Sequence, residues 1–261
     1  MAVDLKGRVA VVTGGSSGIG RATALLLARQ GARVFTGDLR PRAENAQPYA
    51  ALGIAELVCD VRQEGQVAAL VERAVTDGGG LQILVSNAGI DLEKQVPEIS
   101  EAEWDACLDT NLKGSFFAAK HAIPHLRAAG GGAVVFTASN AGLLPRAHDP
   151  VYSTSKAALV AFANSLALCH APDKIRFNSV CPGPVCNTGL IEEGLAAAED
   201  RQRMERQFIE ASPLARALGR MITPEEVAAA ILYLVGDDAA LVTGTAIRID
   251  GGKSLGVPPR T

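Results

Sequence analysis

Short apolar runs alternate with longer helix-like stretches along nearly the whole chain of 261 residues, and this alternation limits the possible folds more than any other feature. The runs are almost continuous in Val, Ile and Ala, which is typical of parallel strands covered on both faces. We therefore predict an α/β fold: a single domain, 1–261, with a doubly wound parallel sheet of about seven strands and helices on both faces. The predicted strands are 8–13, 33–38, 55–60, 81–87, 132–139, 175–181 and 246–250.

Helix-like stretches and one irregular insertion lie between these strands. The insertion, 188–220, is polar and helix-prone and comes just before the last helix. Because ligands bind beyond the carboxyl ends of the strands in this architecture, we expect 188–220 to form a substrate lid. The predicted helices are 18–32, 64–77, 104–126, 152–170 and 224–236.

The charge pattern argues against nucleic-acid and membrane partners. The formal net charge is -3, and acidic and basic residues are interspersed without a basic stripe or a polybasic amphipathic segment. The first residues lack the basic-then-apolar pattern of a signal peptide, and no apolar run approaches the ~20 residues of a membrane-spanning helix. We expect a small-molecule substrate, no nucleic acid and no membrane.

Cysteine and histidine usage indicates a reducing compartment and no metal site. The 5 cysteines are odd in number, scattered, and without a CxxC pair. We expect free thiols and a cytoplasmic location. His121 and His125 have the i, i+4 spacing of helical metal ligands, but no neighbouring glutamate or third ligand accompanies them in the sequence.

The first predicted strand runs into the glycine-rich stretch TGGSSGIG (13–20), in which Gly14, Gly18 and Gly20 precede a helix. Glycines here permit a tight turn and let backbone amides approach a pyrophosphate at the helix N-terminus. The spacing departs from G-x-G-x-x-G, and an ordinary βα turn is the simpler interpretation. Its position after the first strand favours a nucleotide site.

Two acidic residues end the next strands. Asp38 closes the second strand, where a carboxylate can accept hydrogen bonds from the adenosine ribose hydroxyls and would repel a 2′-phosphate. Asp60 closes the third strand and could contact the adenine amino group, or it could be an ordinary solvated carboxylate. Asp38 and the absence of a basic residue at Gly15 predict NAD rather than NADP.

The chain resembles the classical short-chain dehydrogenase/reductase family over essentially its whole length. The matching motifs are TGGSSGIG, SNAG (86–89), TNLKG (110–114), Ser139, YSTSK (152–156) and CPGPV (181–185), in the family's order. The resemblance implies a Rossmann-type fold, a nicotinamide cofactor and hydride transfer at an alcohol or carbonyl carbon. It assigns a catalytic tetrad of Asn111, Ser139, Tyr152 and Lys156. The cofactor-binding residues that it implies are Gly14, Ser17, Gly18, Ile19, Gly20, Asp38, Asp60, Val61, Asn87, Ala88, Gly89, Tyr152, Lys156, Pro182, Gly183, Val185, Asn187 and Thr188.

The residue types agree with this chemistry. Tyr152 and Lys156 share one face of a helix, since residues four apart stack. Oxidising a secondary alcohol needs a base for the hydroxyl proton, and an ordinary tyrosine with a pKa near ~10 is only about one part in a thousand phenolate at pH 7. An ammonium at ~4 Å could lower that pKa by roughly 3 units. We expect Tyr152 to be the acid/base, with Lys156 lowering its pKa, Ser139 donating to the substrate oxygen and Asn111 holding a water.

One motif departs from the family pattern. Relatives usually have PGxVxT, with the threonine at the nicotinamide carboxamide, whereas PGPVCNTG puts Asn187 there and Thr188 one residue later. Either side chain could make the contact.

The leading hypothesis is an NAD-dependent dehydrogenase of a secondary alcohol, such as a sugar, a cyclic diol or another polyhydroxylated compound. The alternatives are a carbonyl reductase of the 3-oxoacyl type and a non-catalytic nucleotide-sensing scaffold. Apolar surplus on 103–128 and 152–171 predicts a homotetramer. Candidate pocket residues are Asp91, Leu92, Asn140, Leu144, His148, Val185 and Leu190.

Overall fold

A seven-stranded, entirely parallel sheet forms the centre of the molecule, in the order β3-β2-β1-β4-β5-β6-β7. The computed structural model describes residues 3–144 and 146–256. The strand order reverses between β1 and β4, which is where ligands bind in doubly wound folds. The predicted Rossmann-type fold is confirmed. The strands are β1 (Val9–Thr13), β2 (Arg33–Asp38), β3 (Ala55–Val58), β4 (Ile83–Ser86), β5 (Gly132–Thr137), β6 (Ile175–Pro182) and β7 (Ala246–Ile249).

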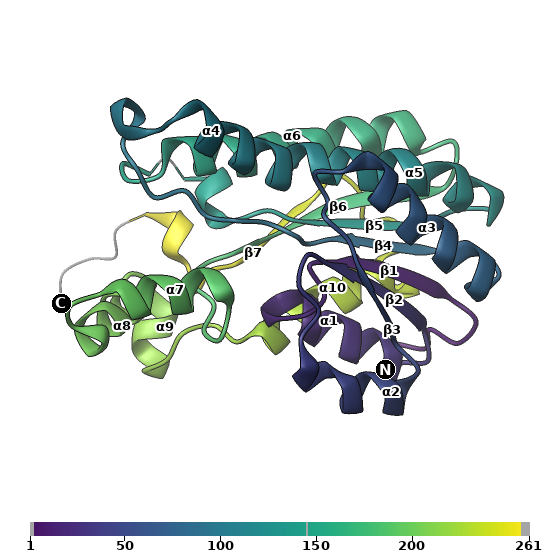
Figure 1. The fold of residues 1–261 in the computed structure, drawn as a ribbon, viewed down its shortest axis with the longest axis horizontal. Coiled ribbons are helices and arrows are strands. Elements are labelled where there is room, and N and C mark those ends of the chain that lie inside the picture. Colours follow the sequence, from purple (N-terminus) through teal and green to yellow (C-terminus); the bar gives the residue numbers. More distant parts are fainter. Residues whose placement is uncertain (1–2, 145, 257–261) are drawn as a thin grey trace.

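Helices cover both faces of this sheet (Figure 1). One face carries α3 (Glu64–Gly78), α5 (Gly114–Ala128) and α6 (Pro150–His170), and the other carries α1 (Gly18–Arg29), α2 (Ala46–Leu52) and α10 (Pro224–Val235). Each layer buries its own apolar cluster, because strand residues alternate between the faces. Phe136 of β5, for example, is fully buried and its ring stacks on that of Phe177. Truncating such a residue typically costs about 3–5 kcal/mol of stability.

The predicted continuous helix 104–126 is wrong in one respect. Ser100 and Glu103 form a capping box that starts α4 (Glu101–Leu108), but a π-helical turn, Asp109–Lys113, separates α4 from α5. A π turn contains one more residue than an α turn and therefore shifts which side chains face the sheet. This turn contains Asn111, whose side chain is fully buried.

The predicted lid segment forms three helices: α7 (Gly189–Ala197), α8 (Arg201–Glu210) and α9 (Pro213–Leu218). They lie together at the lower left of Figure 1. The Leu214 amide donates to the Gly251 carbonyl at 2.9 Å, which ties this group of helices to the segment after β7. The remaining elements are 3₁₀ turns, η1 (Ala43–Asn45), η2 (Val96–Glu98), η4 (Asn140–Gly142), η5 (Asp237–Ala239) and η6 (Lys253–Leu255). No helix in the described ranges is long and apolar enough to cross a membrane.

Candidate active site

The glycine loop between β1 and α1 packs tightly against the turn after β4. A Cβ at Gly20 would lie 2.0 Å from the Gly14 carbonyl oxygen, and a Cβ at Gly14 would lie 2.8 Å from the Cα of Ala88. The Asn87 amide side chain donates to the Gly14 carbonyl at 3.1 Å, so the two predicted motifs meet. Gly18 and Gly20 add no side chain to the first turn of α1, where a bound pyrophosphate would approach the backbone amides. The loop therefore fits a dinucleotide.

A polar network holds the next residue of this loop, Ser16. Its backbone N–H donates to the Asp38 carboxylate at 3.0 Å, and its hydroxyl donates to Glu56 on β3 at 2.6 Å. Asn45 donates to both Glu56, at 3.2 Å, and the Ser16 carbonyl, at 2.9 Å. The phenol of Tyr49 donates to the Gly15 carbonyl. Two carboxylates thus hold one loop residue. Glu56 was not predicted to lie here, because it is 40 positions from Ser16 in the sequence.

The other predicted adenosine contacts are at the end of β3. Both carboxylate oxygens of Asp60 are bound by Arg62, with the shortest distance 2.7 Å, and this pairing holds the pKa of Asp60 below its usual value. The side chain of Val61 is buried against Gly114, so only the backbone of Val61 could contact a ligand. Both oxygens of the Asp60 carboxylate are therefore occupied by the ion pair with Arg62.

Tyr152 and Lys156 lie one turn apart in α6 and are both buried. The Lys156 ammonium is 5.7 Å from the centre of the Tyr152 ring and donates to the Thr137 carbonyl at 3.0 Å. Burial lowers the pKa of Lys156 to about 8. At pH 7 the group is still roughly 90% protonated.

The expectation that Lys156 lowers the pKa of Tyr152 is not met in the protein alone. Burial raises this pKa well above its usual value, and the Asp91 carboxylate adds to the rise. Hydrogen bonding with Ser139 acts in the opposite direction, but more weakly. The physical reason is that a phenolate loses its hydration here, while the ammonium lies over the ring and bonds to a carbonyl.

Asn111 and Ser139 are both buried beside this pair. The Asn111 amide donates to the Ile90 carbonyl and to the Ser155 hydroxyl, each at 3.0 Å, and accepts from the Ile90 amide at 2.8 Å. These bonds connect the loop after β4 with α6. A Cβ at Gly89 would lie 3.1 Å from both the Asn111 side-chain oxygen and the Lys156 ammonium. All four residues of the predicted tetrad therefore surround one region at the carboxyl ends of β4 and β5.

The two candidates for the carboxamide contact are in different environments. Thr188 lies against the glycine loop, since a Cβ at Gly18 would be 3.0 Å from its methyl group, and its hydroxyl donates to the Val185 carbonyl at 2.8 Å. Asn187 is exposed and has a left-handed backbone with φ 55°. Asparagine tolerates that conformation better than most residues. Of the two, Thr188 is therefore the one that lies against the glycine loop. Pro182, Gly183 and Val185 form the end of β6 and the loop that follows it.

The proposed pocket residues divide into buried and exposed groups. Asn140 is buried beside Ser139, and its side-chain nitrogen has no hydrogen-bond partner among the described residues. His148 and Leu190 are exposed. Asp91 borders the open side, although surrounding protein raises its pKa. Leu92 packs against the small apolar cluster that includes Tyr152.

Sequence reasoning missed a charged pair beside this pocket. Arg146 and Asp149 form an ion pair of 3.1 Å, and the Asp149 side chain is almost completely buried. Both charges influence the pKa of Tyr152, with Asp149 raising it and Arg146 lowering it. Asp149 immediately precedes α6, so the place of its side chain is set by the residue at which that helix begins.

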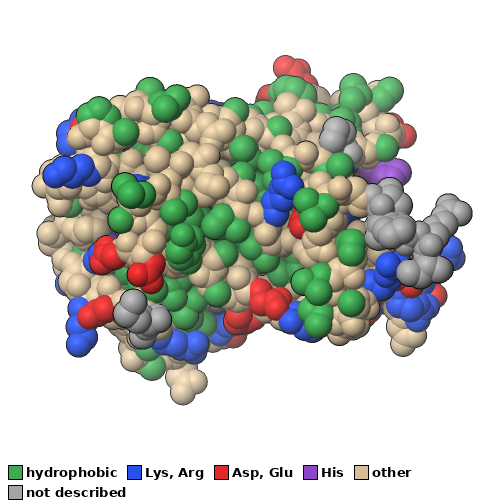
Figure 2. Space-filling view, turned by 180° about the vertical axis from the view of Figure 1, so that it is seen from behind, with side chains coloured by type: hydrophobic (Ala, Val, Ile, Leu, Met, Phe, Trp, Pro, Cys, Tyr) green, Lys and Arg blue, Asp and Glu red, His purple; other side chains and the backbone are tan. Residues whose placement is uncertain are grey.

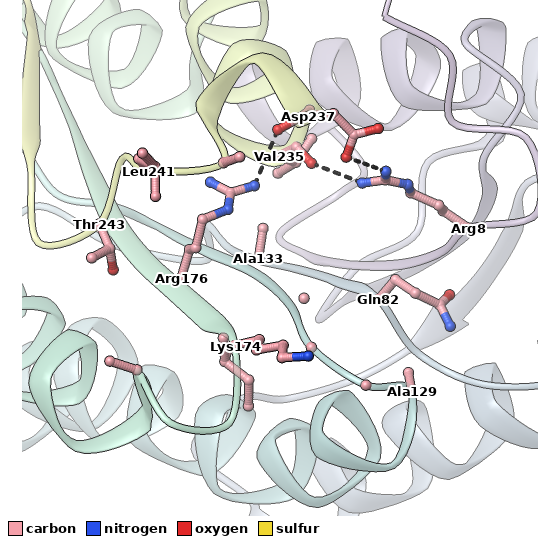
Figure 3. Close-up of a pocket in the computed structure, with 17 residues that line it drawn as sticks. Arg8, Gln82, Ala129, Ala133, Lys174, Arg176, Val235, Asp237, Leu241 and Thr243 are labelled. Atoms are coloured by element: carbon pink, nitrogen blue, oxygen red, sulfur yellow. Dashed lines mark hydrogen bonds and ion pairs between the residues drawn. The ribbon is translucent and has the colours of Figure 1, made fainter.

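A cavity of about 630 Å³ lies at the opposite edge of the sheet and has another role (Figure 3). Its two half-buried arginines point at the end of α10: Arg8 donates to the Val235 carbonyl at 3.3 Å, and Arg176 donates to the Leu234 carbonyl at 2.5 Å. Cations stabilise a helix C-terminus in this way. We assign these arginines to capping α10. Separately, the described residues contain no cluster of His, Cys, Asp or Glu that could hold a metal.

Known proteins resemble this chain along its whole length. A family model described as enoyl-(acyl carrier protein) reductase matches residues 14–254. A cis-4-hydroxycyclohexanecarboxylate dehydrogenase of Sinomonas cyclohexanicum is 40% identical over 94% of this chain and 96% of its own. The 4-formylbenzenesulfonate dehydrogenase of Comamonas testosteroni is 36% identical over 97% of this chain and 100% of its own.

A solved structure also has the same fold as this chain. The aldohexose dehydrogenase of Thermoplasma acidophilum has a TM-score of 0.90 and 30% identity, over 100% of this chain and 99% of its own. Members of this family are oxidoreductases that use nicotinamide cofactors. The motifs, the sheet order and these similarities together lead to one conclusion: the chain belongs to the classical short-chain dehydrogenase/reductase family.

Proposed function

We propose that this chain is an NAD-dependent dehydrogenase that converts a secondary alcohol to the ketone, with Tyr152 as the acid/base. The observation that carries the proposal is the convergence of Ser139, Tyr152 and Lys156 beside a glycine loop that fits a dinucleotide. When bound, the oxidised nicotinamide supplies the hydride acceptor and a positive charge near the phenol. The carbinol hydrogen leaves as hydride, and the hydroxyl proton passes to the Tyr152 oxygen.

The chain's own residues then have separate tasks. Ser139 orients the substrate oxygen, and Lys156 supplies a positive charge that favours phenolate once the site is closed to water. Because burial raises the Tyr152 pKa, the phenolate depends on these nearby positive charges. Asn111 fixes the distance between the loop after β4 and α6.

The preference for NAD rests on two carboxylates. Asp38 ends β2 and binds the Ser16 amide, while Glu56 binds the hydroxyl of the same residue. A ribose 2′-hydroxyl can donate to a carboxylate, whereas a 2′-phosphate is repelled by both. This arrangement supports NAD over NADP.

The substrate class is supported by the relatives. Two of them act on six-membered rings that carry a second functional group, and the structural neighbour acts on a hexose. We therefore propose a ring alcohol with a further polar group. His148, exposed in the loop before α6, is proposed to bond that group. His148→Ala should then raise KM for a sugar or cyclic diol but not for a simple alcohol.

The decisive experiment measures NADH formation over sugars, cyclic diols, hydroxysteroids and aliphatic alcohols. Tyr152→Phe should abolish turnover while NAD binding, followed by fluorescence, stays nearly unchanged. Tyr233→Phe is the matched control, because Tyr233 is 41% exposed on α10 and far along the chain from the tetrad. Substantial residual activity in Tyr152→Phe would sink the mechanism.

One observation favours a second candidate, a carbonyl reductase of the 3-oxoacyl type. The raised pKa of Tyr152 keeps the phenol protonated, and a protonated phenol is the acid that carbonyl reduction needs. Oxidation of NADH or NADPH with a 3-oxoacyl thioester separates the two candidates. A scaffold without catalysis would turn over neither substrate.

We further propose a homotetramer in the cytoplasm, with 188–220 acting as the lid. Figure 2 shows hydrophobic side chains gathered across the middle of the face turned away in Figure 1. Leu168 of α6 is 83% exposed and Leu241, before β7, is 99% exposed. Contiguous exposed apolar surface usually marks an interface. Light scattering tests the assembly, and a monomer at micromolar concentration would refute it. The free cysteines agree with a reducing compartment.

A further inference from the structure

The turn that carries Ser139 lies very close to the helix that carries Tyr152 and Lys156. Gly142 ends this turn, η4, and a Cβ on it would lie 2.7 Å from the carbonyl carbon and oxygen of Lys156 and 2.8 Å from the Ala157 nitrogen. Ordinary van der Waals contact of a Cβ begins at 3.4 Å. The backbone of Gly142 lies outside the left-handed region, so alanine suits its conformation. Only the lack of space excludes a side chain at this position.

Short hydrogen-bonded links join Gly142 to Ser139. The Gly142 amide donates to the Ser139 carbonyl at 3.0 Å, and the Ala141 amide donates to the Ser139 hydroxyl at 3.1 Å. Ala141 is buried in the same small apolar cluster as Tyr152 and Val151, so the turn packs directly against the start of α6. A displacement at Gly142 is therefore passed on to the Ser139 hydroxyl.

The helix α6 is held more firmly than the turn η4. Successive turns of α6 bury Leu159, Ala163 and Ala167 in the core cluster on that face of the sheet. η4 is a single 3₁₀ turn, followed by a loop that leads to α6. Because packed interiors hardly compress, a Cβ at Gly142 would displace the turn rather than the helix. To restore ordinary contact from 2.7 Å, the turn would have to move by about 0.7 Å.

We propose that Gly142 is a positioning residue for the reaction: because it has no side chain, η4 lies against α6 and holds the Ser139 hydroxyl within reach of Tyr152. This rests on the proposed alcohol oxidation at Tyr152. Gly142 acts through Ser139 and takes no part in the bond changes. Misplacing a reacting group by about 1 Å can lower a rate about 100-fold, so the displacement expected at this turn is large enough to matter.

The pH dependence of the oxidation distinguishes this role from a merely structural one. Burial raises the pKa of Tyr152, and hydrogen bonding with Ser139 lowers it. Moving Ser139 away therefore raises this pKa further, and the rise of kcat with pH moves to higher pH, because the phenolate is the base. The charged groups that also act on the phenol or lie over its ring do not belong to η4; they are Asp91, Arg146, Asp149 and Lys156.

The test compares Gly142→Ala with Gly78→Ala. A Cβ at Gly78, the last residue of α3, would meet Val9 at 2.7 Å, where β1 begins at the edge of the sheet opposite the tetrad. Gly142→Ala should lower kcat about 10- to 100-fold and leave the Kd for NADH within about twofold. It should also raise the midpoint of the kcat–pH curve by about 0.5 to 1 unit, the equivalent of one hydrogen bond. Gly78→Ala should lower Tm without changing the midpoint.

A second variant tests the same turn without a clash. Ala141→Gly removes the contact of η4 with the cluster around Tyr152, so it should raise the midpoint in the same direction by a smaller amount. In a Ser139→Ala background, Gly142→Ala should lower the residual kcat by less than about threefold, because the hydroxyl through which it acts is gone.

The outcomes separate this proposal from the proposed function. Kinetics of Gly142→Ala that match those of Gly78→Ala, or an equal loss of kcat with and without the Ser139 hydroxyl, would overturn the role of Gly142. An unchanged midpoint in both Gly142→Ala and Ala141→Gly would overturn it as well. Full activity of Tyr152→Phe would instead overturn the proposed oxidation.

Discussion

Replacing Asp38 should change the cofactor preference, and the structure indicates by how much. Asp38 is half-buried at the end of β2, and its carboxylate accepts N–H donors from Ser16 at 3.0 Å and from Arg40 at 3.1 Å. Both donors are backbone groups, so they hold the carboxylate in position without neutralising it. Asp38→Ala removes this charge and leaves Glu56 as the remaining carboxylate on Ser16.

The magnitude follows from two terms. A ribose hydroxyl bonded to a carboxylate contributes about 1.5–3 kcal/mol. A 2′-phosphate would lose that bond and be repelled, although solvent at this half-buried position screens much of the repulsion. A net difference of about 2.7 kcal/mol corresponds to a preference for NAD of roughly 100-fold in kcat/KM. Asp38→Ala should lower that preference at least tenfold, and adding Glu56→Gln should lower it further.

Steady-state kinetics with NAD and NADP on one alcohol measure this preference. Arg73→Gln is a suitable control, because Arg73 pairs with Asp77 on the exposed side of α3. Comparable efficiency with both cofactors in the unmodified protein would refute the reasoning, since it would mean that neither carboxylate faces the ribose.

Three further outcomes are expected. Gly20→Ala should abolish NADH binding measured by fluorescence, because its Cβ would lie 2.0 Å from the Gly14 carbonyl, whereas Gly65→Ala, with open space around it, should not. Lys156→Met should raise Tm at pH 7, and this gain should shrink towards pH 9.5. The buried ammonium has a lowered pKa of about 8, so its charge destabilises the fold fully below pH 8. Above pH 8 the folded protein loses this charge, and the destabilisation decreases. A constant gain would contradict this. Cys169 should react first with a thiol reagent, and the buried Cys59, Cys107 and Cys181, whose pKa values burial raises, only after unfolding. Rapid modification of all thiols in the native protein would show that they are not buried.

The sheet was predictable because continuous apolar runs have few alternatives. The runs at 33–38 and 175–181 coincide with β2 and β6 to within one residue. The short helix Ala46–Leu52 was missed, since AQPYAAL has neither a clear cap nor enough length to show a period. Likewise, no local pattern distinguishes a π-helical turn from the α-helix around it.

The tetrad was predictable from motif resemblance, but its electrostatics were not. The pKa of Tyr152 depends on how completely α6 and the loop containing Asp91 enclose the phenol, which is a property of the whole fold. The Glu56–Ser16 bond arises from strand pairing, which brings the two residues together only after folding. A single sequence shows which residues are neighbours along the chain, but it does not show which residues meet across the sheet.

The π-helical turn Asp109–Lys113 makes the chain intolerant of length changes at this point. Deleting one of its residues would convert it to an α turn, which leaves α4 and α5 close to their present orientation but moves the side chains inside the turn. Asn111 would then lose its hydrogen bonds with Ile90. Sequence drift between β4 and β5 should therefore proceed by substitution, whereas the segment that carries α7 to α9 can gain or lose residues. New specificities in descendants of this chain are expected to come from insertions in that segment.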